Sequence, residues 1–144
     1  MRKVAAVVGV GVGIGGEVAK ALAAAGYDVG LFSRNKSYKG ADKLSPLVRE
    51  IGAERAWGIV MDAADQGSVR SGFAELRQLS GGRGVSVLVY NAGARRMGDT
   101  AVEAQDAQEL LDFWRVNAFG AFLCVQQVWG DMTAAGSGTI LLTG

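Results

Sequence analysis

The chain has 144 residues, 49% of them apolar, which is typical of one domain of ordinary size with a substantial core. Its 15 basic and 14 acidic residues leave a formal charge of +1 and form no long single-sign block, so we expect neither a nucleic-acid partner nor a membrane partner. The chain contains no histidine and one cysteine, Cys124, which excludes histidine triads, histidine-ligated metals and an intrachain disulfide. Since no apolar stretch approaches the ~20 residues that span a bilayer, we expect a cytoplasmic protein.

The first predicted element is an apolar strand over residues 4–8, followed by glycines and an amphipathic helix over 14–25. The glycines fit Gly-x-x-x-Gly-x-Gly over 9–15, Gly-x-Gly-x-x-Gly over 11–16, or Gly-x-Gly-x-Gly over 9–13. Such a turn lets backbone N–H groups approach a pyrophosphate at the positive end of a helix. A flexible connection is the alternative, but five glycines in eight positions cost backbone entropy that a connection would not need. A P-loop is excluded because no Gly-Lys-Ser/Thr follows. The residues expected to bind a cofactor here are Gly9, Gly11, Gly13, Ile14 and Gly15.

Strands and helices then alternate to the end of the chain. Further strands are predicted at 29–32, 55–60, 85–90 and 139–142, buried on both faces because they run apolar without alternation. Helices are predicted at 44–51, around 69–76 and over roughly 106–134. The expected helix signals are Ser45 as a cap with Pro46 in the first turn, Asp106 and Glu109 in capping-box-like positions, and Gly26, Gly52 and Gly81 as helix ends. This alternation predicts right-handed crossovers and a parallel α/β sheet covered on both faces.

The second strand is followed by Ser33 and Arg34, where an acidic residue would bind the ribose 2′-hydroxyl of NAD. With no carboxylate to repel a 2′-phosphate, and a guanidinium able to pair with it, these two residues favour NADP(H) over NAD(H). The alternative is a solvated arginine in a generally basic loop that also holds Lys36 and Lys39.

Polar and small residues follow the third and fourth strands. Asp62 and Ala63 stand after the third strand, and Asn91, Ala92 and Gly93 after the fourth. Because ligands bind beyond the carboxyl ends of parallel strands, Asp62 is expected to accept a hydrogen bond from an adenine amino group, with the other four at the cofactor. A turn or helix-cap role for Asp62 is an equal alternative.

Two residues are unusual for the interior of the long helix. Asn117 stands among apolar side chains, where a buried amide would need partners, although a place on the wet face of the helix is an equal alternative. Gly120 is a poor helix former and suggests close approach by another element.

Together these residues resemble the short-chain dehydrogenase/reductase family from Lys3 to Gly144. The resemblance rests on Gly9, Gly13, Gly15, Asp62, Asn91-Ala92-Gly93, Val116-Asn117 and the segment 138–144. It implies a Rossmann-like doubly wound sheet of five strands in the order 3-2-1-4-5, with 1–144 as a dinucleotide-binding domain. Two positions depart from the family pattern, Val8 where threonine is common and Tyr90 where asparagine is common, which could loosen local hydrogen bonding.

The resemblance further implies hydride transfer between the nicotinamide C4 of NADP(H) and a small carbonyl or alcohol substrate. In the family a serine, a tyrosine and a lysine four residues beyond that tyrosine carry the chemistry, and an asparagine supports a water-linked proton relay. Only the asparagine has a counterpart, Asn117, because no tyrosine of this sequence has a lysine four positions on. We therefore expect a chain that is truncated before the serine and the tyrosine-lysine pair, binds cofactor and has little or no dehydrogenase activity. The resemblance also implies a homo-oligomer formed through the long helix 106–134 in the intact family form. The truncation predicts that one strand edge and an aromatic face of this helix are left uncovered.

Two alternatives stay open on the residues alone. A nucleotide-binding half without catalytic groups could serve as a non-catalytic sensor of the NADP(H) redox state. The segment Gly9 to Gly13 also fits the glycine loop of a methyltransferase that uses S-adenosylmethionine, but such enzymes want an acid at the second strand end, where Ser33 and Arg34 stand.

Overall fold

The computed structural model describes residues 1–34, 37–38, 41–94 and 101–143. Lys36, Lys39 and Gly144 lie outside the described residues. Within the described part of the chain, no helix is both long enough and apolar enough to cross a membrane.

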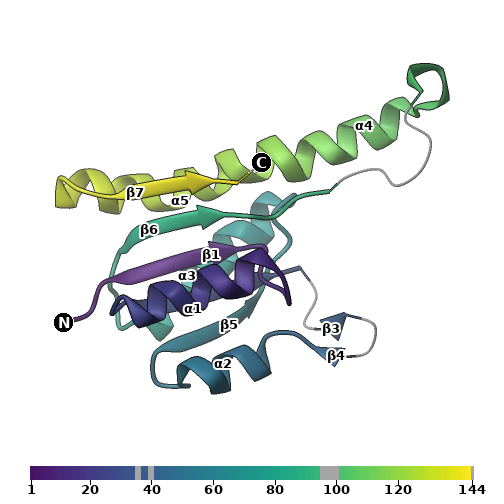
Figure 1. The fold of residues 1–144 in the computed structure, drawn as a ribbon. Helices are drawn as coiled ribbons and strands as arrows, with labels where there is room; N and C mark the ends of the chain where they lie inside the picture. Colours follow the sequence, from purple (N-terminus) through teal and green to yellow (C-terminus); the bar gives the residue numbers. More distant parts are fainter. Residues whose placement is uncertain (35–36, 39–40, 95–100, 144) are drawn as a thin grey trace.

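Five parallel strands form the central sheet (Figure 1). They are β1 (Val4–Val8), β2 (Asp28–Ser33), β5 (Ala56–Val60), β6 (Val85–Tyr90) and β7 (Thr139–Leu142), in the spatial order β5-β2-β1-β6-β7. This order confirms the predicted 3-2-1-4-5 arrangement. Val8 pairs with Phe32 on one side and with Tyr90 on the other, so the carboxyl ends of the three central strands lie at one edge.

Helices cover both faces of the sheet. Helix α1 (Ile14–Ala24) packs on β1 and β2, and α2 (Ser45–Ile51) packs on β5 and α1; on the other face, α3 (Gln66–Leu79) contacts β5, and α5 (Gly120–Ala135) contacts β6 and α3. Figure 1 shows α1 in front of the sheet and α3 behind it. Helix α4 (Ala107–Trp114), which precedes α5, extends beyond the sheet. The sequence did not predict the short β3–β4 hairpin (Ser37–Tyr38 with Ala41–Asp42) or the 3₁₀ turn Val102–Ala104.

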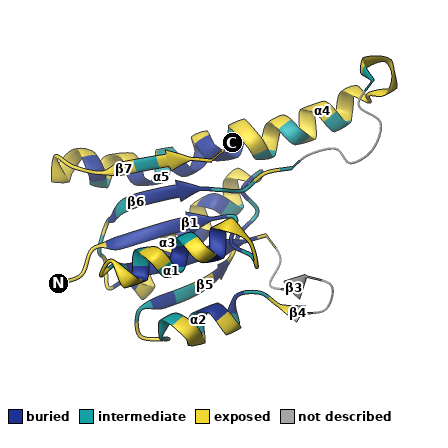
Figure 2. Cartoon of the chain, viewed as in Figure 1, coloured by how far each residue is buried: buried dark blue, intermediate teal, exposed yellow. Residues whose placement is uncertain are grey.

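The core divides into two apolar layers, one on each face of the sheet (Figure 2). Phe32 and Phe73 stack across one layer with ring centroids 4.9 Å apart. All residues of β1 and β2 are buried, as predicted. The prediction of burial on both faces is wrong for the edge strands, because Val60 of β5 is 54% exposed and Leu141 and Leu142 of β7 are 52% and 62% exposed. An apolar run predicts a strand, but it does not show whether that strand lies at the centre of the sheet or at its edge, where it has only one neighbouring strand.

The structure confirms some of the predicted helix ends and corrects one. Gly26, Gly52 and Gly81 follow α1, α2 and α3 with positive φ angles of 94°, 115° and 71°, and Asp106 caps α4 through the N–H groups of Gln108 and Glu109. The expected cap at Ser45 is wrong. Ser45 is the first helical residue, and the carboxylate of Asp42 accepts from the N–H groups of Leu44 and Ser45 instead.

The long helix predicted over 106–134 is not one regular helix. A π-helical segment, Arg115–Phe119, separates α4 from α5, and the N–H of Gly120 donates to the carbonyl of Arg115, five residues back. None of the residues of α4 is buried. Exposed apolar side chains line this region: Leu110, Leu111 and Trp114 on α4, with Phe122 and Trp129 on α5.

An ionic cluster closes the amino-terminal edge of the sheet, opposite the glycine-rich turn. Asp28, 4% exposed, accepts from Arg2 Nε at 2.8 Å and from Arg83 Nη1 at 2.7 Å, and Arg55 Nε lies 3.6 Å from the same carboxylate. Burial raises the pKa of Asp28, but the hydrogen bond from Arg83 and the charge of Arg2 outweigh it, so this pKa lies below its ordinary value. The cluster joins the start of β2 to the segments before β1, β5 and β6.

Candidate nucleotide site

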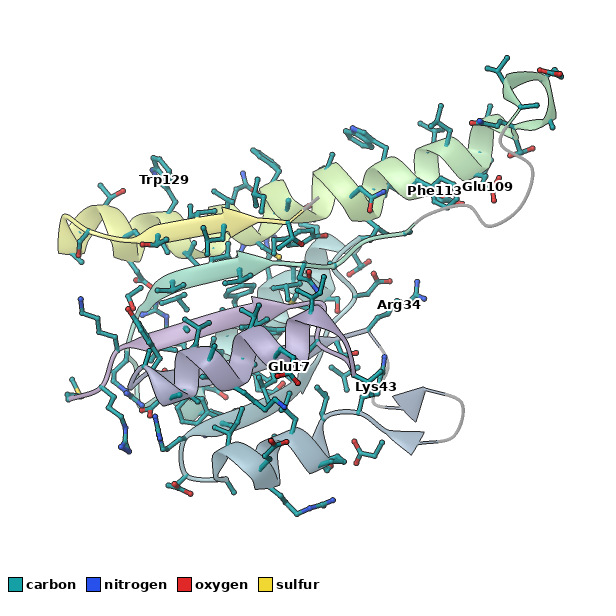
Figure 3. The ribbon with its side chains drawn as sticks, in the orientation of Figure 1. Glu17, Arg34, Lys43, Glu109, Phe113 and Trp129 are labelled. Carbon is teal, nitrogen blue, oxygen red and sulfur yellow. The ribbon has the colours of Figure 1, made fainter. Side chains whose placement is uncertain are left out.

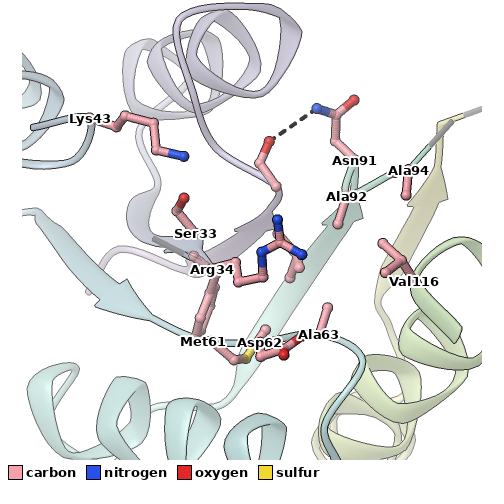
Figure 4. Close-up of a pocket in the computed structure, with 14 residues that line it drawn as sticks. Ser33, Arg34, Lys43, Met61, Asp62, Ala63, Asn91, Ala92, Ala94 and Val116 are labelled. Atoms are coloured by element: carbon pink, nitrogen blue, oxygen red, sulfur yellow. Dashed lines mark hydrogen bonds between the residues drawn. The ribbon is translucent and has the colours of Figure 1, made fainter. Parts of the chain in front are cut away.

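A cavity of about 370 Å³ lies at the carboxyl ends of β1, β2, β5 and β6 (Figure 4). Most of the predicted site residues line it: Gly9, Ser33, Arg34, Asp62, Ala63, Asn91, Ala92 and Gly93. Gly11, Gly13, Ile14, Gly15 and Asn117 are not among the lining residues. The cavity therefore brings together residues from four separate strand ends.

The glycines of the turn after β1 and of the first turn of α1 are of two kinds. A Cβ on Gly9, whose φ is +90°, would overlap the backbone of Asn91 and Ala92, and a Cβ on Gly15 would overlap the carbonyl of Gly9. At Gly11 and Gly13 an added Cβ would have no heavy atom within 4 Å. Gly9 and Gly15 thus serve packing of the turn, whereas Gly11 and Gly13 leave open space in front of the backbone.

The amino end of α1 borders this open space. Gly13 caps the helix without a side chain, and its carbonyl accepts from the N–H groups of Gly16 and Glu17. Ile14, the first helical residue, is 67% exposed. Because the positive end of the helix dipole and the first-turn N–H groups favour an anion, this end is suited to a phosphate group.

Two cations line the cavity near the end of β2, Arg34 directly after the strand and Lys43 just before α2. Ser33 is buried and Arg34 is exposed, and both line the cavity with Lys43, which precedes α2. Figure 4 shows the Lys43 side chain beside Ser33 and the Arg34 side chain extending away from Ser33 toward the middle of the pocket, and Figure 3 shows both at the same edge of the sheet. Lys43 is not among the residues predicted from the sequence; the available signal was its place just before the start of a predicted helix at this edge.

Asp62 has the predicted turn role and also lines the cavity. Its Oδ1 accepts from the N–H of Ala64 at 2.9 Å, and its own N–H donates to Ser68 Oγ at 2.9 Å, which confirms a turn role. The residue also lines the cavity, so the turn fixes a carboxylate there. A carboxylate has further acceptor sites beyond the one used by Ala64.

Asn91 ties three strand ends together. Its backbone N–H donates to the carbonyl of Val8 at 2.7 Å, its side-chain Nδ2 donates to the carbonyl of Gly9 at 3.1 Å, and its Oδ1 accepts from Thr143 Oγ1 at 2.7 Å. These bonds hold the Asn91-Ala92-Gly93 segment against the glycine turn. Because Ala92 and Gly93 carry little or no side chain, the backbone stays accessible from the cavity.

Asn117 lies in the π-helical segment and faces the loop after β6. Its Oδ1 accepts from the N–H of Ala94 and its Nδ2 donates to the carbonyl of Ala94, both at 2.8 Å. Asn117 is exposed, which agrees with the predicted alternative of a place on the wet face of the helix. Its amide is nevertheless hydrogen-bonded through both Oδ1 and Nδ2. Ala94 and Val116 both line the cavity, so Asn117 fixes one of its walls.

Comparison with known proteins agrees with this architecture. The chain is 35% identical to a galactitol 2-dehydrogenase (L-tagatose-forming) from Cereibacter sphaeroides, over 97% of this chain and 51% of that protein. It is 33% identical to a 3-oxoacyl-[acyl-carrier-protein] reductase from Staphylococcus epidermidis, over 98% of this chain and 55% of that protein. The chain therefore spans about half the length of the curated relatives it matches.

Solved structures give the same result. A short-chain dehydrogenase from Streptomyces avermitilis superposes with a TM-score of 0.84 at 30% identity, covering 97% of this chain and 49% of that one. A gluconate 5-dehydrogenase from Burkholderia cenocepacia, in complex with NADP and tartrate, superposes with a TM-score of 0.80 at 30% identity, covering 97% and 52%. The profile of the short chain dehydrogenase family matches residues 3–144. The chain belongs to the short chain dehydrogenase family.

Proposed function

We propose that this chain is a dinucleotide-binding domain that holds NADP(H) for hydride transfer with a small carbonyl or alcohol substrate. The observation that carries the proposal is the open backbone at Gly11 and Gly13, beside a cavity lined by Ser33 and Arg34 at the end of β2 and by Lys43 before α2. A pyrophosphate is expected at this turn and at the start of α1, including Ile14. At Gly11 and Gly13 any residue other than glycine would place a Cβ in the space in front of the backbone that the pyrophosphate would occupy. When bound, the nicotinamide ring supplies or accepts the hydride.

The adenosine end of the dinucleotide is assigned to the β2 side of the cavity. Arg34 and Lys43 would bind a 2′-phosphate, and Asp62 would accept from the adenine amino group through an oxygen not used by Ala64. Ser33 stands where NAD-binding proteins place an acid. The gluconate 5-dehydrogenase neighbour is itself an NADP complex, which supports the same cofactor here.

The nicotinamide end is assigned to the opposite wall, formed by Ala92, Gly93, Ala94 and Val116. Asn117 is proposed to support a proton relay there. Because Ala94 takes one N–H of Nδ2 and one lone pair of Oδ1, the second N–H and the second lone pair of this side chain are the groups that would hold a water molecule.

The exposed apolar residues of α4 and α5 support the further proposal that the protein self-associates through these helices. Trp114, Phe122 and Trp129 are 53%, 56% and 62% exposed, and Figure 3 shows Trp129 directed away from the sheet. Large apolar side chains that remain exposed along neighbouring helices support an interface. A second copy of the chain is the proposed partner.

Isothermal titration calorimetry with NADPH and NADH tests the cofactor assignment. Wild-type protein should bind NADPH more tightly, and Arg34→Gln should weaken NADPH binding by about 10–100-fold, the equivalent of losing a charge-assisted hydrogen bond, while changing NADH binding little. Lys43→Gln should act in the same direction with a smaller effect. Arg49→Gln, an exposed arginine on α2, serves as the control. Equal affinity for the two cofactors, or equal losses in Arg34→Gln, would contradict the assignment.

A further inference from the structure

Tyr90, the last residue of β6, makes a contact that the proposed function does not use. Its side chain is 2% exposed, and its hydroxyl donates to the carbonyl oxygen of Val116, in the π-helical segment. Burial, with smaller contributions from Cys124 and Asp62, raises the pKa of this phenol well above its ordinary value. The hydroxyl therefore keeps its proton, and remains a donor, throughout the range in which the protein is handled.

Gly120 lets the helix approach this phenol closely. A Cβ at Gly120 would overlap the hydroxyl oxygen of Tyr90 and would lie 2.7 Å from the carbonyl oxygen of Ala63. The helix thus packs on the end of Tyr90 at a distance that only glycine permits. This accounts for a glycine at the first position of α5, where its helix propensity is poor.

The π-helical turn coincides with this contact. Gly120 donates its N–H to Arg115, five residues back, and the Val116 carbonyl inside the turn is bonded by the phenol. A π-helical turn is rare and occurs where a group inserts beside the helical hydrogen-bond ladder, frequently at functional sites. Asn117 directly follows Val116, and its amide makes the two bonds to Ala94.

We propose that Tyr90 is a positioning residue, which, together with Gly120, sets the π-helical turn and so holds Asn117 on Ala94 at the cavity wall away from Ser33 (Figure 4). The consequence for cofactor binding rests on the proposed function, because that wall is assigned to the nicotinamide half. Asparagine is common at this position in the family, and its replacement was expected to loosen local hydrogen bonding. Tyr90 instead supplies a bond between sheet and helix.

The test uses Tyr90→Phe, which removes only the hydroxyl. Tyr27→Phe is the matched control, because Tyr27 precedes β2 at the opposite edge of the sheet and packs in the other apolar layer. In Tyr90→Phe, amide hydrogen exchange of Ala94 should accelerate by about tenfold, and the Asn117 side-chain NH₂ resonances should shift, while Leu31 in β2 keeps its protection. Tyr27→Phe should leave all three unchanged.

Nucleotide binding supplies the second readout. Tyr90→Phe should weaken binding of NADPH by about five- to tenfold but leave the affinity for 2′,5′-ADP within about twofold, since the adenosine end is assigned to Ser33 and Arg34. A general loss of stability would affect both nucleotides alike. Unchanged resonances at Ala94 and Asn117, or equal losses for the two nucleotides, would overturn the inference.

Two further results separate this inference from the proposed function. If wild-type protein binds neither nucleotide, the proposed function fails, but the exchange and NH₂ measurements still decide whether Tyr90 positions Asn117. If Tyr90→Phe does not fold, wild-type protein decides the matter: the Tyr90 hydroxyl proton should exchange slowly and show a nuclear Overhauser effect to the Gly120 α protons. Absence of that signal at low temperature would overturn the inference.

Discussion

Replacing Asp28 by asparagine tests the ionic cluster at the amino-terminal edge of the sheet. The substitution keeps size and one acceptor oxygen but removes the negative charge that faces Arg2, Arg83 and Arg55. Because Asp28 is buried, the guanidinium groups would be left around a neutral amide whose NH₂ group points at cations. Breaking a buried ion pair in this way costs about 3–5 kcal/mol of the free energy of unfolding.

Partial exposure of the arginines lowers that figure. The side chain of Arg2 is 50% exposed and those of Arg83 and Arg55 are 20% and 23% exposed, so water can compensate part of the lost interaction. We expect a loss of about 2–3 kcal/mol. With a urea m-value of about 2 kcal/mol per molar, the unfolding midpoint at pH 7 should fall by about 1–1.5 M.

The effect should depend on pH with a definite sign. The pKa of Asp28 is lowered in the folded state relative to the unfolded chain, so its stabilisation is present above the unfolded pKa of about 4 and is lost as the pH falls through the folded pKa. The difference between wild type and Asp28→Asn should therefore be constant near neutrality and shrink in acid. Asp112→Asn is the control, because its pair with Arg115 is exposed on both sides and is worth less than about 0.5 kcal/mol. An Asp28→Asn midpoint equal to that of the control would refute the reasoning.

Three other predictions concern packing, reactivity and association. In a urea titration, Gly15→Ala should lower the free energy of unfolding by about 1–3 kcal/mol because its Cβ overlaps the carbonyl of Gly9, whereas Gly11→Ala, in open space, should stay within about 0.5 kcal/mol of wild type. Equal effects of the two substitutions would be inconsistent with two kinds of glycine. Burial raises the pKa of the Cys124 thiol to about 12, so a thiol reagent at pH 8 should label it only after denaturation, and rapid labelling of the native protein would show that the residue is accessible. Trp129→Lys should shift sedimentation profiles toward monomer if α5 mediates self-association, and an unchanged profile would argue against that interface.

The sequence predicted the fold well where a single physical signal decided it. Uninterrupted apolar segments separated by helix-period patterns were sufficient for the five main strands and for their order once the family resemblance was included. The same signal could not separate central from edge strands, so the exposure of Val60 and Leu142 was missed. It also could not predict the π-helical interruption, which depends on Tyr90, a residue 26 positions before Val116 that meets it only in the folded protein.

The candidate site was predictable where residues follow strand ends. Ser33, Arg34, Asp62 and Asn91 reach one cavity because parallel strands end at one edge. Lys43 was missed because it comes from the loop before α2, whose path is not set by strand periodicity. The bonds between Asn117 and Ala94 were likewise unpredictable from spacing, since they join a helix to a loop distant in sequence.

Chemical-shift mapping of the ¹⁵N-labelled chain with NADP⁺ tests the central assignment most directly. We expect the largest amide shifts at residues 11–16, at Ser33 and Arg34, at Asp62 and over residues 91–94, with Asp28 and its neighbours at the opposite edge unaffected. Shifts that are absent at millimolar nucleotide, or that are centred away from the glycine turn, would contradict the account.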